Sequence, residues 1–171
     1  MNSMKKIKIE KVTLNVGAGK DPKQLERGEK LLENITGIKP VKTTTQKRIQ
    51  GWGLRPGLPI GCKITLRGEE AKEMVERLVY AKDNVFADSS FDDQGNISLG
   101  IKEYVDIKDA KYDVEIGMMG LQANITLTRP GFRVKNKRIR KSKIPARHKI
   151  SKDEAKEFMK ENYKVKIGEE Q

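Results

Sequence analysis

The sequence has few of the residues that build disulfide frameworks, metal clusters or catalytic centres. Its 171 residues include one cysteine, Cys62, and one histidine, His148. A single cysteine excludes an intramolecular disulfide, and the two residues together are too few for a structural zinc cluster. No apolar run approaches the roughly 20 residues that span a bilayer, and residues 1–10 lack the apolar stretch of a secretory signal. We therefore expect a cytoplasmic protein without metal or cofactor.

Acidic residues are absent from two long stretches of the chain. Between Glu33 and Glu69, the first basic window, there are seven Lys or Arg and no Asp or Glu. Between Glu115 and Asp153, the second basic window, there are eleven. The two windows carry +18 and the whole chain +12, so the remaining residues are net −6. Basic blocks on a mildly acidic body indicate a surface that binds a polyanion.

Hydrophobic periodicity predicts a mixture of strands and helices. Strict alternation of apolar and polar residues is typical of strands with one buried face, and apolar residues three and four apart are typical of helices. The expected order is strand 7–16, helix 22–36, extended segment 41–49, strand 60–66, helix 69–82, strands 97–101 and 121–128, and a helix that begins after residue 151.

This order matches a split βαβ arrangement, which is ferredoxin-like and shared by RNA-recognition motifs. The expected fold class is α+β, an antiparallel sheet with helices on one face, plus long loops and a basic C-terminal extension. Residues 1–128 are expected to form a single RNA-binding domain. Residues 129–171 are expected to form the basic extension and a C-terminal helix packed on that domain.

Capping residues support two of the helices. Asp21 and Pro22 are typical of an N-cap and first helical position, and Gly37 is typical of a C-cap. Ser151 and Glu154 have the spacing of a capping box, which predicts the start of the last helix.

The polar faces of the strands carry Lys and Arg side chains, hydroxyls and amides, but no carboxylate. An ordinary solvent-exposed face is the alternative, because any sheet covered on one side has a polar face toward water. Such exposed strands normally carry both acidic and basic side chains, however. Donors of this kind suit phosphate and ribose. The strand segments lack the aromatic rings that stack single-stranded bases, so structured RNA is favoured. The face comprises Lys63, Thr65, Arg67, Gln122, Asn124, Thr126 and Thr128, with Lys42, Thr44, Gln46 and Arg48 from the extended segment.

Two further segments have a composition that favours contact with a partner. Residues 129–149 hold ten Lys or Arg with interspersed apolar residues, which favours an extension that becomes ordered on RNA over a solvated tail or a localisation signal. Residues 51–61 are rich in glycine and proline and carry the lone Trp52. A buried tryptophan is the commoner case, but these neighbours favour a projecting loop.

A glycine turn after the first strand leaves an enzymatic alternative open. Gly17 to Lys20 precedes a helix and is similar to a phosphate-binding turn, so a nucleotide-dependent enzyme is the rival interpretation. The turn lacks the third glycine of a dinucleotide fingerprint and the Gly-Lys-Ser/Thr of a P-loop. No catalytic constellation accompanies it, and we expect no enzymatic activity.

Several longer motifs resemble one family. The longest is Ile49-x-Gly-x-x-Leu-Arg-x-Gly-x-Pro-Ile-Gly-x-Lys-x-Thr-Leu-Arg-Gly68. Others are Asn15-Val-Gly-x-Gly19, and Phe91-Asp-Asp-x-Gly-Asn96 running into Gly100-Ile-x-Glu103. Together they resemble the universal large-subunit ribosomal protein number five family, which binds 5S rRNA. Near the C-terminus, Arg129-Pro-Gly-Phe-Arg-Val134 is similar to the archaeal and eukaryotic branch, and Pro-Ile-Gly61 favours an archaeal type.

The resemblance implies a structural constituent of the large ribosomal subunit. It implies attachment of 5S rRNA in the central protuberance, contact with 23S rRNA and P-site tRNA, and neighbours among large-subunit proteins and a small-subunit head protein. The loop expected to contact tRNA comprises Gly51, Trp52, Gly53, Leu54, Arg55, Pro56 and Gly57. The residues expected to contact rRNA are Asn15, Gly17, Gly19, Lys42, Thr44, Gln46, Lys47, Arg48, Lys63, Thr65, Arg67, Gln122, Asn124, Thr126, Arg129, Arg133, Lys137, Arg138, Arg140, Lys143, Arg147 and His148.

Overall fold

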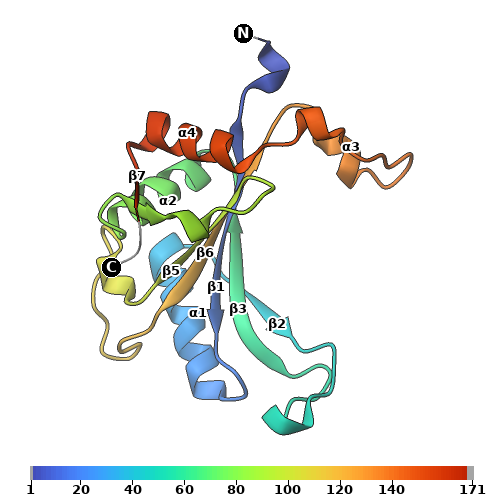
Figure 1. Ribbon diagram of the computed structural model, residues 1–171. Helices are drawn as coiled ribbons and strands as arrows, with labels where there is room; N and C mark the ends of the chain where they lie inside the picture. The colour runs from blue at the N-terminus through green and yellow to red at the C-terminus, as the bar shows by residue number, and fades with distance from the viewer. Residues whose placement is uncertain (1, 169–171) are drawn as a thin grey trace. The chain divides into compact units, whose positions relative to one another are not determined.

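A computed structural model describes residues 2–168 and shows an α+β protein (Figure 1); residues 1 and 169–171, at the ends of the two expected domains, lie outside the described part. The main sheet has the order β2-β3-β1-β6-β5. A two-stranded parallel sheet pairs β4 with β7. The strands are β1 (Lys8–Gly17), β2 (Val41–Thr44), β3 (Pro59–Leu66), β4 (Val85–Ala87), β5 (Asn96–Ile101), β6 (Leu121–Thr128) and β7 (Lys166–Gly168). The α-helices are α1 (Pro22–Thr36), α2 (Glu69–Tyr80), α3 (Arg133–Asn136) and α4 (Lys152–Tyr163).

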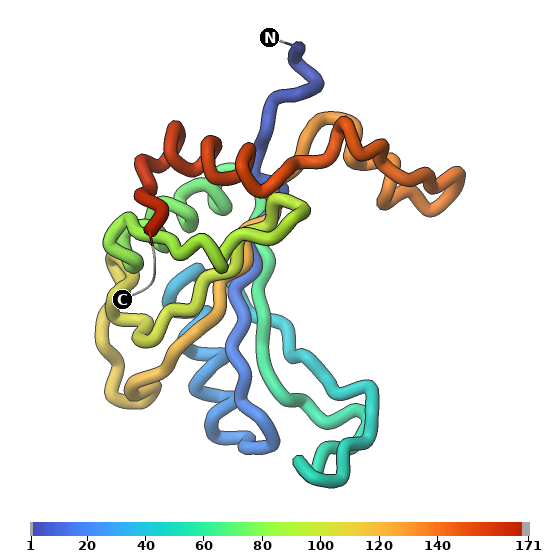
Figure 2. The backbone as a smooth tube through the Cα atoms, in the orientation of Figure 1, coloured from blue at the N-terminus to red at the C-terminus, as the bar shows by residue number. Residues whose placement is uncertain are grey.

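The sheet order confirms the split βαβ arrangement. The crossover through α1 joins β1 to β2 and skips β3, and the chain after α2 passes from β3 to the other side of β1, where β6 and β5 lie, as in a ferredoxin-like fold. β5 is an added edge strand beside β6. The strands expected from alternation all form, and none of their ends moves by more than five residues. The backbone tube in Figure 2 shows the same path from the N-terminus through both helical crossovers.

Internal contacts divide the chain into two compact units. The first unit comprises residues 2–12, 66–99 and 124–168, and the second comprises residues 13–65 and 100–123. Each unit therefore draws on segments far apart in the sequence, and the strands β1, β3, β5 and β6 contribute residues to both.

In the second unit, α1 approaches its strands closely through a glycine. Asp21 caps the helix by accepting from the Lys23 backbone N–H at 3.0 Å, and Gly37 ends it with φ 70°. A Cβ at Gly28 would lie 3.0 Å from Val16 Cγ1 and 3.1 Å from Cys62 Sγ. Because glycine has no such atom, the helix packs directly on β1 and β3 and covers one side of them.

Cys62 lies in this core, as its strand phase predicted. Its side chain is fully buried, and burial raises the pKa of the thiol to about 11. A protonated, inaccessible thiol packs as a small apolar group and is a poor nucleophile.

In the first unit, α4 begins at the predicted capping box. Ser151 Oγ accepts from the Glu154 backbone N–H at 3.3 Å, and a Glu154 carboxylate oxygen accepts from the Ser151 N–H at 3.0 Å. Asp88 binds both Lys152 and Lys156 of the helix. These ammonium groups lower the pKa of the Asp88 carboxyl to about 2. Ion pairs and caps thus fix where α4 begins and how it lies within its unit.

Neither a membrane span nor a metal cluster occurs in the described chain. No helix within residues 2–168 has both the length and the apolar character to cross a bilayer. The same residues contain no group of three or more His, Cys, Asp or Glu placed to hold a metal ion.

Gly61 sits where β3 and β1 approach most tightly, and this generates a stability prediction. A Cβ at Gly61 would lie 2.6 Å from the Val16 carbonyl oxygen, which is backbone and cannot rotate away. We expect Gly61→Ala to lower the free energy of unfolding by about 1–3 kcal/mol, as measured in urea. Gly100→Ala, on β5 with open space around it, is the control and should be neutral or slightly stabilising. Equal effects of both variants would contradict the close-approach argument.

Candidate nucleic-acid interface

The strands of the second unit present a polar side opposite α1. On β3, Lys63 and Thr65 are exposed between the buried residues Cys62, Ile64 and Leu66. On β1, Asn15 is half-buried in the same alternating pattern, and on β6, Gln122 is exposed. These side chains supply one ammonium group, a hydroxyl and amides, and none is a carboxylate. The predicted polar face therefore forms on these strands.

The edge strand β2 does not present Lys42 and Thr44 on one side, as expected: Thr44, paired with Pro59, lies on the polar side, and Lys42 does not. Lys42 pairs with Cys62 across the antiparallel ladder, so both lie on the side that α1 covers. There Lys42 Nζ lies 3.0 Å from Glu29 of α1. Val41, paired with Lys63, and Thr43, paired with Gly61, lie on the polar side instead. Simple alternation places Lys42 and Thr44 together, but the register shifts between Thr43 and Thr44, so Thr43 and Thr44 share the polar side and Lys42 lies opposite them.

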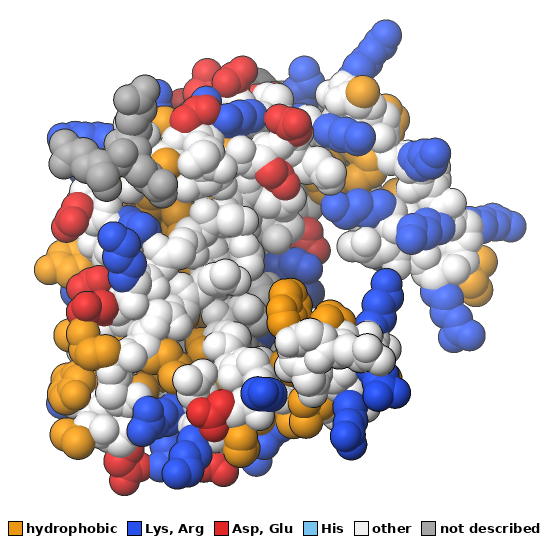
Figure 3. All heavy atoms as spheres, turned by 60° about the horizontal axis from the view of Figure 1, so that its bottom comes forward, with side chains coloured by type: hydrophobic (Ala, Val, Ile, Leu, Met, Phe, Trp, Pro, Cys, Tyr) orange, Lys and Arg blue, Asp and Glu red, His pale blue; other side chains and the backbone are white. Residues whose placement is uncertain are grey.

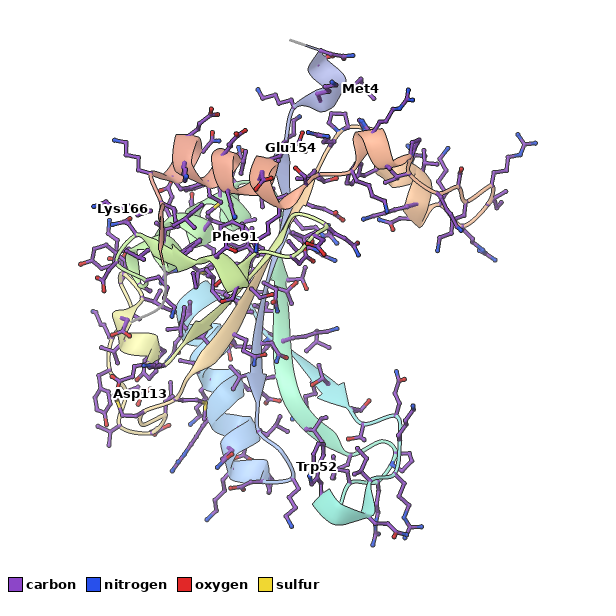
Figure 4. All side chains as sticks on the ribbon, in the orientation of Figure 1. Met4, Trp52, Phe91, Asp113, Glu154 and Lys166 are labelled. Carbon is purple, nitrogen blue, oxygen red and sulfur yellow. The ribbon has the colours of Figure 1, made fainter. Side chains whose placement is uncertain are left out.

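The loop after β2 is an ordered projection. Thr45 is buried, donates its backbone N–H to the Leu58 carbonyl at 2.9 Å and accepts from Gly57 N–H at 2.8 Å. Ile49 and Leu54 form a β-bridge. Leu54 is 8% exposed and anchors the loop, whereas Trp52 is 69% exposed. Figure 4 shows Trp52 at the far end of this loop.

The remaining loop residues expected to bind RNA or tRNA are all exposed. Three are cations, one is an amide and one a hydroxyl, and the rest are glycine or proline. They are Thr44, Gln46, Lys47, Arg48, Gly51, Gly53, Arg55, Pro56 and Gly57. The projection predicted from glycine and proline is confirmed, with Leu54 as the residue that points inward.

The glycine turn is not built to cradle a nucleotide phosphate. Gly17 ends β1, Gly19 has φ 61°, and Ala18 between them is buried and donates to the Ile60 carbonyl at 2.9 Å. The N-terminus of α1 is capped by the Asp21 carboxylate. A carboxylate at the site where a phosphate would accept N–H groups repels that phosphate.

In the first unit, the side chain of Arg129, the first cation of the second basic window, makes internal contacts. Its side chain is 5% exposed, and its Nη2 donates to Glu154 Oε1 at 2.7 Å. Its Nη1 donates to the Lys149 carbonyl at 3.0 Å. Burial raises the pKa of the Glu154 carboxyl. The Ser151 N–H and the Arg129 guanidinium lower it by more than that, so the pKa lies below its ordinary value. Figure 4 labels Glu154 in the first turn of α4.

His148 is likewise committed to an internal contact. Its Nε2 lies 2.9 Å from the Pro130 carbonyl oxygen, which requires a proton on that nitrogen. Its ring meets Phe132 edge to face with centroids 5.6 Å apart. Arg129 and His148 therefore tie together the two ends of a chain segment of about 20 residues, and binding of RNA by either remains a prediction.

Between these ties lies the basic extension, residues 130–148. It contains the short helix α3 and a 3-10 turn at Ala146–His148, neither of which periodicity revealed. Lys and Arg side chains project from it and from the loop after β2 (Figure 3). Its exposed cations expected to contact rRNA are Arg133, Lys137, Arg138, Arg140, Lys143 and Arg147.

Most cations of the two basic windows have no protein partner. Among residues 2–168, ion pairs involve four of the eighteen: Lys42, Arg67, Arg129 and Lys152. Arg67 is a marginal case, since its Nη1 lies 4.0 Å from Glu10. Asn124 and Thr126, half-buried on the first unit's part of β6, add amide and hydroxyl groups. The unpaired cations leave a positive charge that only an external anion can neutralise.

Comparison with known proteins decides the family. Residues 2–55 match the family model for ribosomal protein L5, and residues 59–162 match the model for the C-terminus of the same ribosomal family. The chain belongs to the uL5 family of ribosomal proteins. Large ribosomal subunit protein uL5 of Sulfurisphaera tokodaii is 46% identical over 99% of this chain and 96% of its own length. That of Nanoarchaeum equitans is 48% identical over 96% and 97%, and that of Methanosphaera stadtmanae 41% over 98% and 99%.

Membership in the uL5 family settles the broad function. The protein is a structural, non-enzymatic ribosomal protein of archaeal type, with ribosomal RNA and ribosomal proteins as its partners. The nucleotide-dependent enzyme considered from Gly17–Lys20 is thereby wrong, in agreement with the Asp21 cap at that turn.

The Arg129 contacts predict a role in stability. We expect Arg129→Met to lower the free energy of unfolding by about 2–3 kcal/mol, somewhat below the cost of breaking a fully buried pair because Glu154 is partly exposed. Arg138→Met removes an exposed, unpaired cation of the same extension and should change stability by less than about 0.5 kcal/mol. Urea unfolding compares the two.

The same pair sets a pH dependence. Because the Glu154 carboxyl has a lowered pKa in the folded protein, its contribution is present above the ordinary carboxyl pKa and is lost as the pH falls through the folded value. The difference between wild type and Arg129→Met should therefore shrink in acid. A constant difference would contradict the ion pair.

Proposed function

We propose that this uL5 protein binds 5S rRNA, helps attach it in the central protuberance of the large subunit, and contacts 23S rRNA. The observation that carries the proposal is the set of unpaired cations in the two basic windows, described above. Charges without internal partners contribute no ion-pair stability to the fold, so their value lies in binding an external polyanion. Phosphate contacts through Lys and Arg dominate the affinity of such interfaces.

The chemistry of the strands favours structured RNA over single strands. The polar sides of β1, β3 and β6 offer Asn15, Lys63, Thr65 and Gln122, and no aromatic ring. Hydroxyls and amides suit the ribose 2′-OH and phosphate oxygens of a folded RNA, whereas stacking of splayed bases requires rings. This supports recognition of 5S rRNA by its shape and backbone.

The loop after β2 is suited to a separate contact, which we assign to P-site tRNA. Its Thr45 and Leu54 anchors hold the tip in place, and Trp52 and Arg55 are both exposed on it. An aromatic ring and a guanidinium on one loop provide stacking and phosphate binding without base specificity. That combination fits a contact that must accept every tRNA.

A third surface suits a protein partner, which we assign to the small-subunit head. Residues 103–119 carry five acidic and two basic side chains, a balance that disfavours RNA. Tyr112, Val114 and Met118 are exposed there, and the segment is held by the Asp113 N–H, which donates to the Tyr104 hydroxyl at 2.8 Å. Exposed apolar groups with an acidic rim are typical of protein interfaces.

Salt dependence tests the electrostatic account of 5S rRNA binding. If about eight cations contact phosphates, the slope of log affinity against log salt concentration should be about −6 to −7. Filter binding of the full chain to 5S rRNA measures it. A flat dependence would contradict the assignment of the unpaired cations.

Variants of the loop tip separate the tRNA role from the 5S rRNA role. Trp52→Ala and Arg55→Ala should leave 5S rRNA affinity within about twofold, since neither side chain lies on the strand faces. They should weaken P-site tRNA binding on assembled ribosomes by about tenfold, on the order of one lost stacking contact. Lys63→Ala is the matched control with the opposite pattern. Loss of 5S rRNA affinity in the tip variants would show that the loop is assigned to the wrong RNA.

A further inference from the structure

A pocket in the first unit has a composition that the proposed surfaces do not use. Its volume is about 280 Å³, and its apolar walls are Phe132, Ile144 and Ile150. Drug-sized ligands occupy sites of roughly 300–1,000 Å³, so this pocket has room for one small ring system. Three segments distant in sequence meet here: the turn before β5, the start of α3 and the chain leading into α4.

Polar groups at the pocket are cationic or neutral. Lys135, Lys143 and Lys149 line it together with Gln94, and no carboxylate does. Among residues 2–168, none of these three lysines has an ion-pair partner; Lys135 Nζ lies 5.2 Å from the centroid of the Phe132 ring. The Gln94 side-chain amide has no hydrogen-bond partner within the described chain, although its backbone N–H is fixed by Asp92 Oδ1 at 2.8 Å.

The walls formed by Phe132 and Ile150 are held by internal contacts before a ligand arrives. Ile150 is 1% exposed, and a Cβ at Gly95 would lie 2.6 Å from its Cγ2, so the turn packs tightly on it. The carbonyl of Lys149 accepts from Arg129, and Phe132 packs against His148. A preformed site binds without the entropic cost of ordering its own walls.

An apolar pocket, an amide and three ammonium groups match the chemistry of one nucleotide. We infer that this pocket receives the base of a single unpaired nucleotide of ribosomal RNA. The base lies against Phe132 and Ile144, with the buried Ile150 at the bottom of the pocket, and Gln94 donates to and accepts from the edge of the base. The lysines bind the flanking phosphates. This inference rests on the proposed function, because an RNA must lie along the basic extension to deliver the nucleotide.

Unpaired nucleotides suit such a site for an energetic reason. Extruding a base from a duplex costs a few kcal/mol, and a bulged or loop nucleotide has already met that cost. The strand faces lack rings, so they recognise backbone; the pocket supplies the base-specific contact that they do not. Binding of one base in the pocket would fix the position of the RNA along the extension, which backbone contacts alone do not.

Methyl NMR of the full chain tests the inference directly. With isoleucine methyl groups labelled with ¹³C, an unpaired ribo-oligonucleotide should move the Ile144 and Ile150 signals by the ring current of the inserted base. Inorganic polyphosphate presents the charge without the base and should leave these two methyls in place. Nucleoside monophosphates distinguish a free nucleotide from one in RNA, and they should bind at least tenfold more weakly because they carry one phosphate instead of one on each side.

Two variants and a control complete the test. Ile144→Trp fills the pocket, and Gln94→Glu adds a carboxylate beside the phosphates without touching the core. Each should weaken 5S or 23S rRNA binding by about tenfold, as expected for one lost base contact. Ile139→Trp, at a position 76% exposed on the same extension and outside the pocket, should have no effect. Thermal unfolding confirms that the variants are folded.

The outcomes separate this inference from the function on which it rests. If wild type binds 5S rRNA with a steep salt dependence but the isoleucine methyls do not move, the pocket assignment is overturned and the proposed function stands. Equal shifts with polyphosphate, or unchanged rRNA affinity of both pocket variants, would also overturn it. If wild type fails to bind 5S rRNA at all, the proposed function itself fails.

Discussion

The buried guanidinium of Arg129 is the interaction on which the organisation of the first unit depends. A charge with so little exposure is tolerated only when it is paired and hydrogen bonded, and here the partners are Glu154 and the carbonyls that precede α4. The same Glu154 completes the capping box with Ser151. One cation therefore connects the residue that follows β6 to the first turn of α4 and holds the two ends of the basic extension together.

The rest of the positive charge serves a different purpose. Arg129 is committed inside the protein, whereas most neighbouring cations of the extension point outward without partners. The second unit follows the same rule on its strands, where Lys42 pairs with α1 and Lys63 stays free on the polar side. Each unit thus contains a few cations that build the fold and many that remain available to RNA. This division is what a structural uL5 protein requires, since its partner is a polyanion and its reaction is assembly.

Sequence reasoning succeeded where a local pattern decides the outcome. Strict alternation predicted β6, and the caps at Asp21 and Ser151 predicted the starts of α1 and α4. The three-residue strands β4 and β7 escaped notice because alternation over three residues carries no signal.

Long-range pairings account for what sequence reasoning missed at the candidate surfaces. The pairing of Lys42 with Cys62, and the register shift that places Thr44 on the other side of the sheet from Lys42, emerge only when β2 meets β3. Arg129 was expected to contact RNA because its partner, Glu154, lies just past the end of the acid-free window, 25 residues along the chain. Gln94 and Ile150 gave no hint of a pocket, because their meeting with Phe132 is a property of the tertiary fold.

Arg129 and His148 hold the two ends of the basic extension together in the free protein, and we expect residues 137–141 between them to become ordered on RNA. Amide hydrogen exchange of the full chain, alone and with 5S rRNA, tests this most directly. We expect the amides of Phe132 and His148, which donate to the Arg129 and Pro145 carbonyls, to be protected in the free protein, while residues 137–141 exchange rapidly until 5S rRNA is added. Rapid exchange throughout residues 129–150 in the free protein, or no added protection of residues 137–141 on binding, would contradict the account.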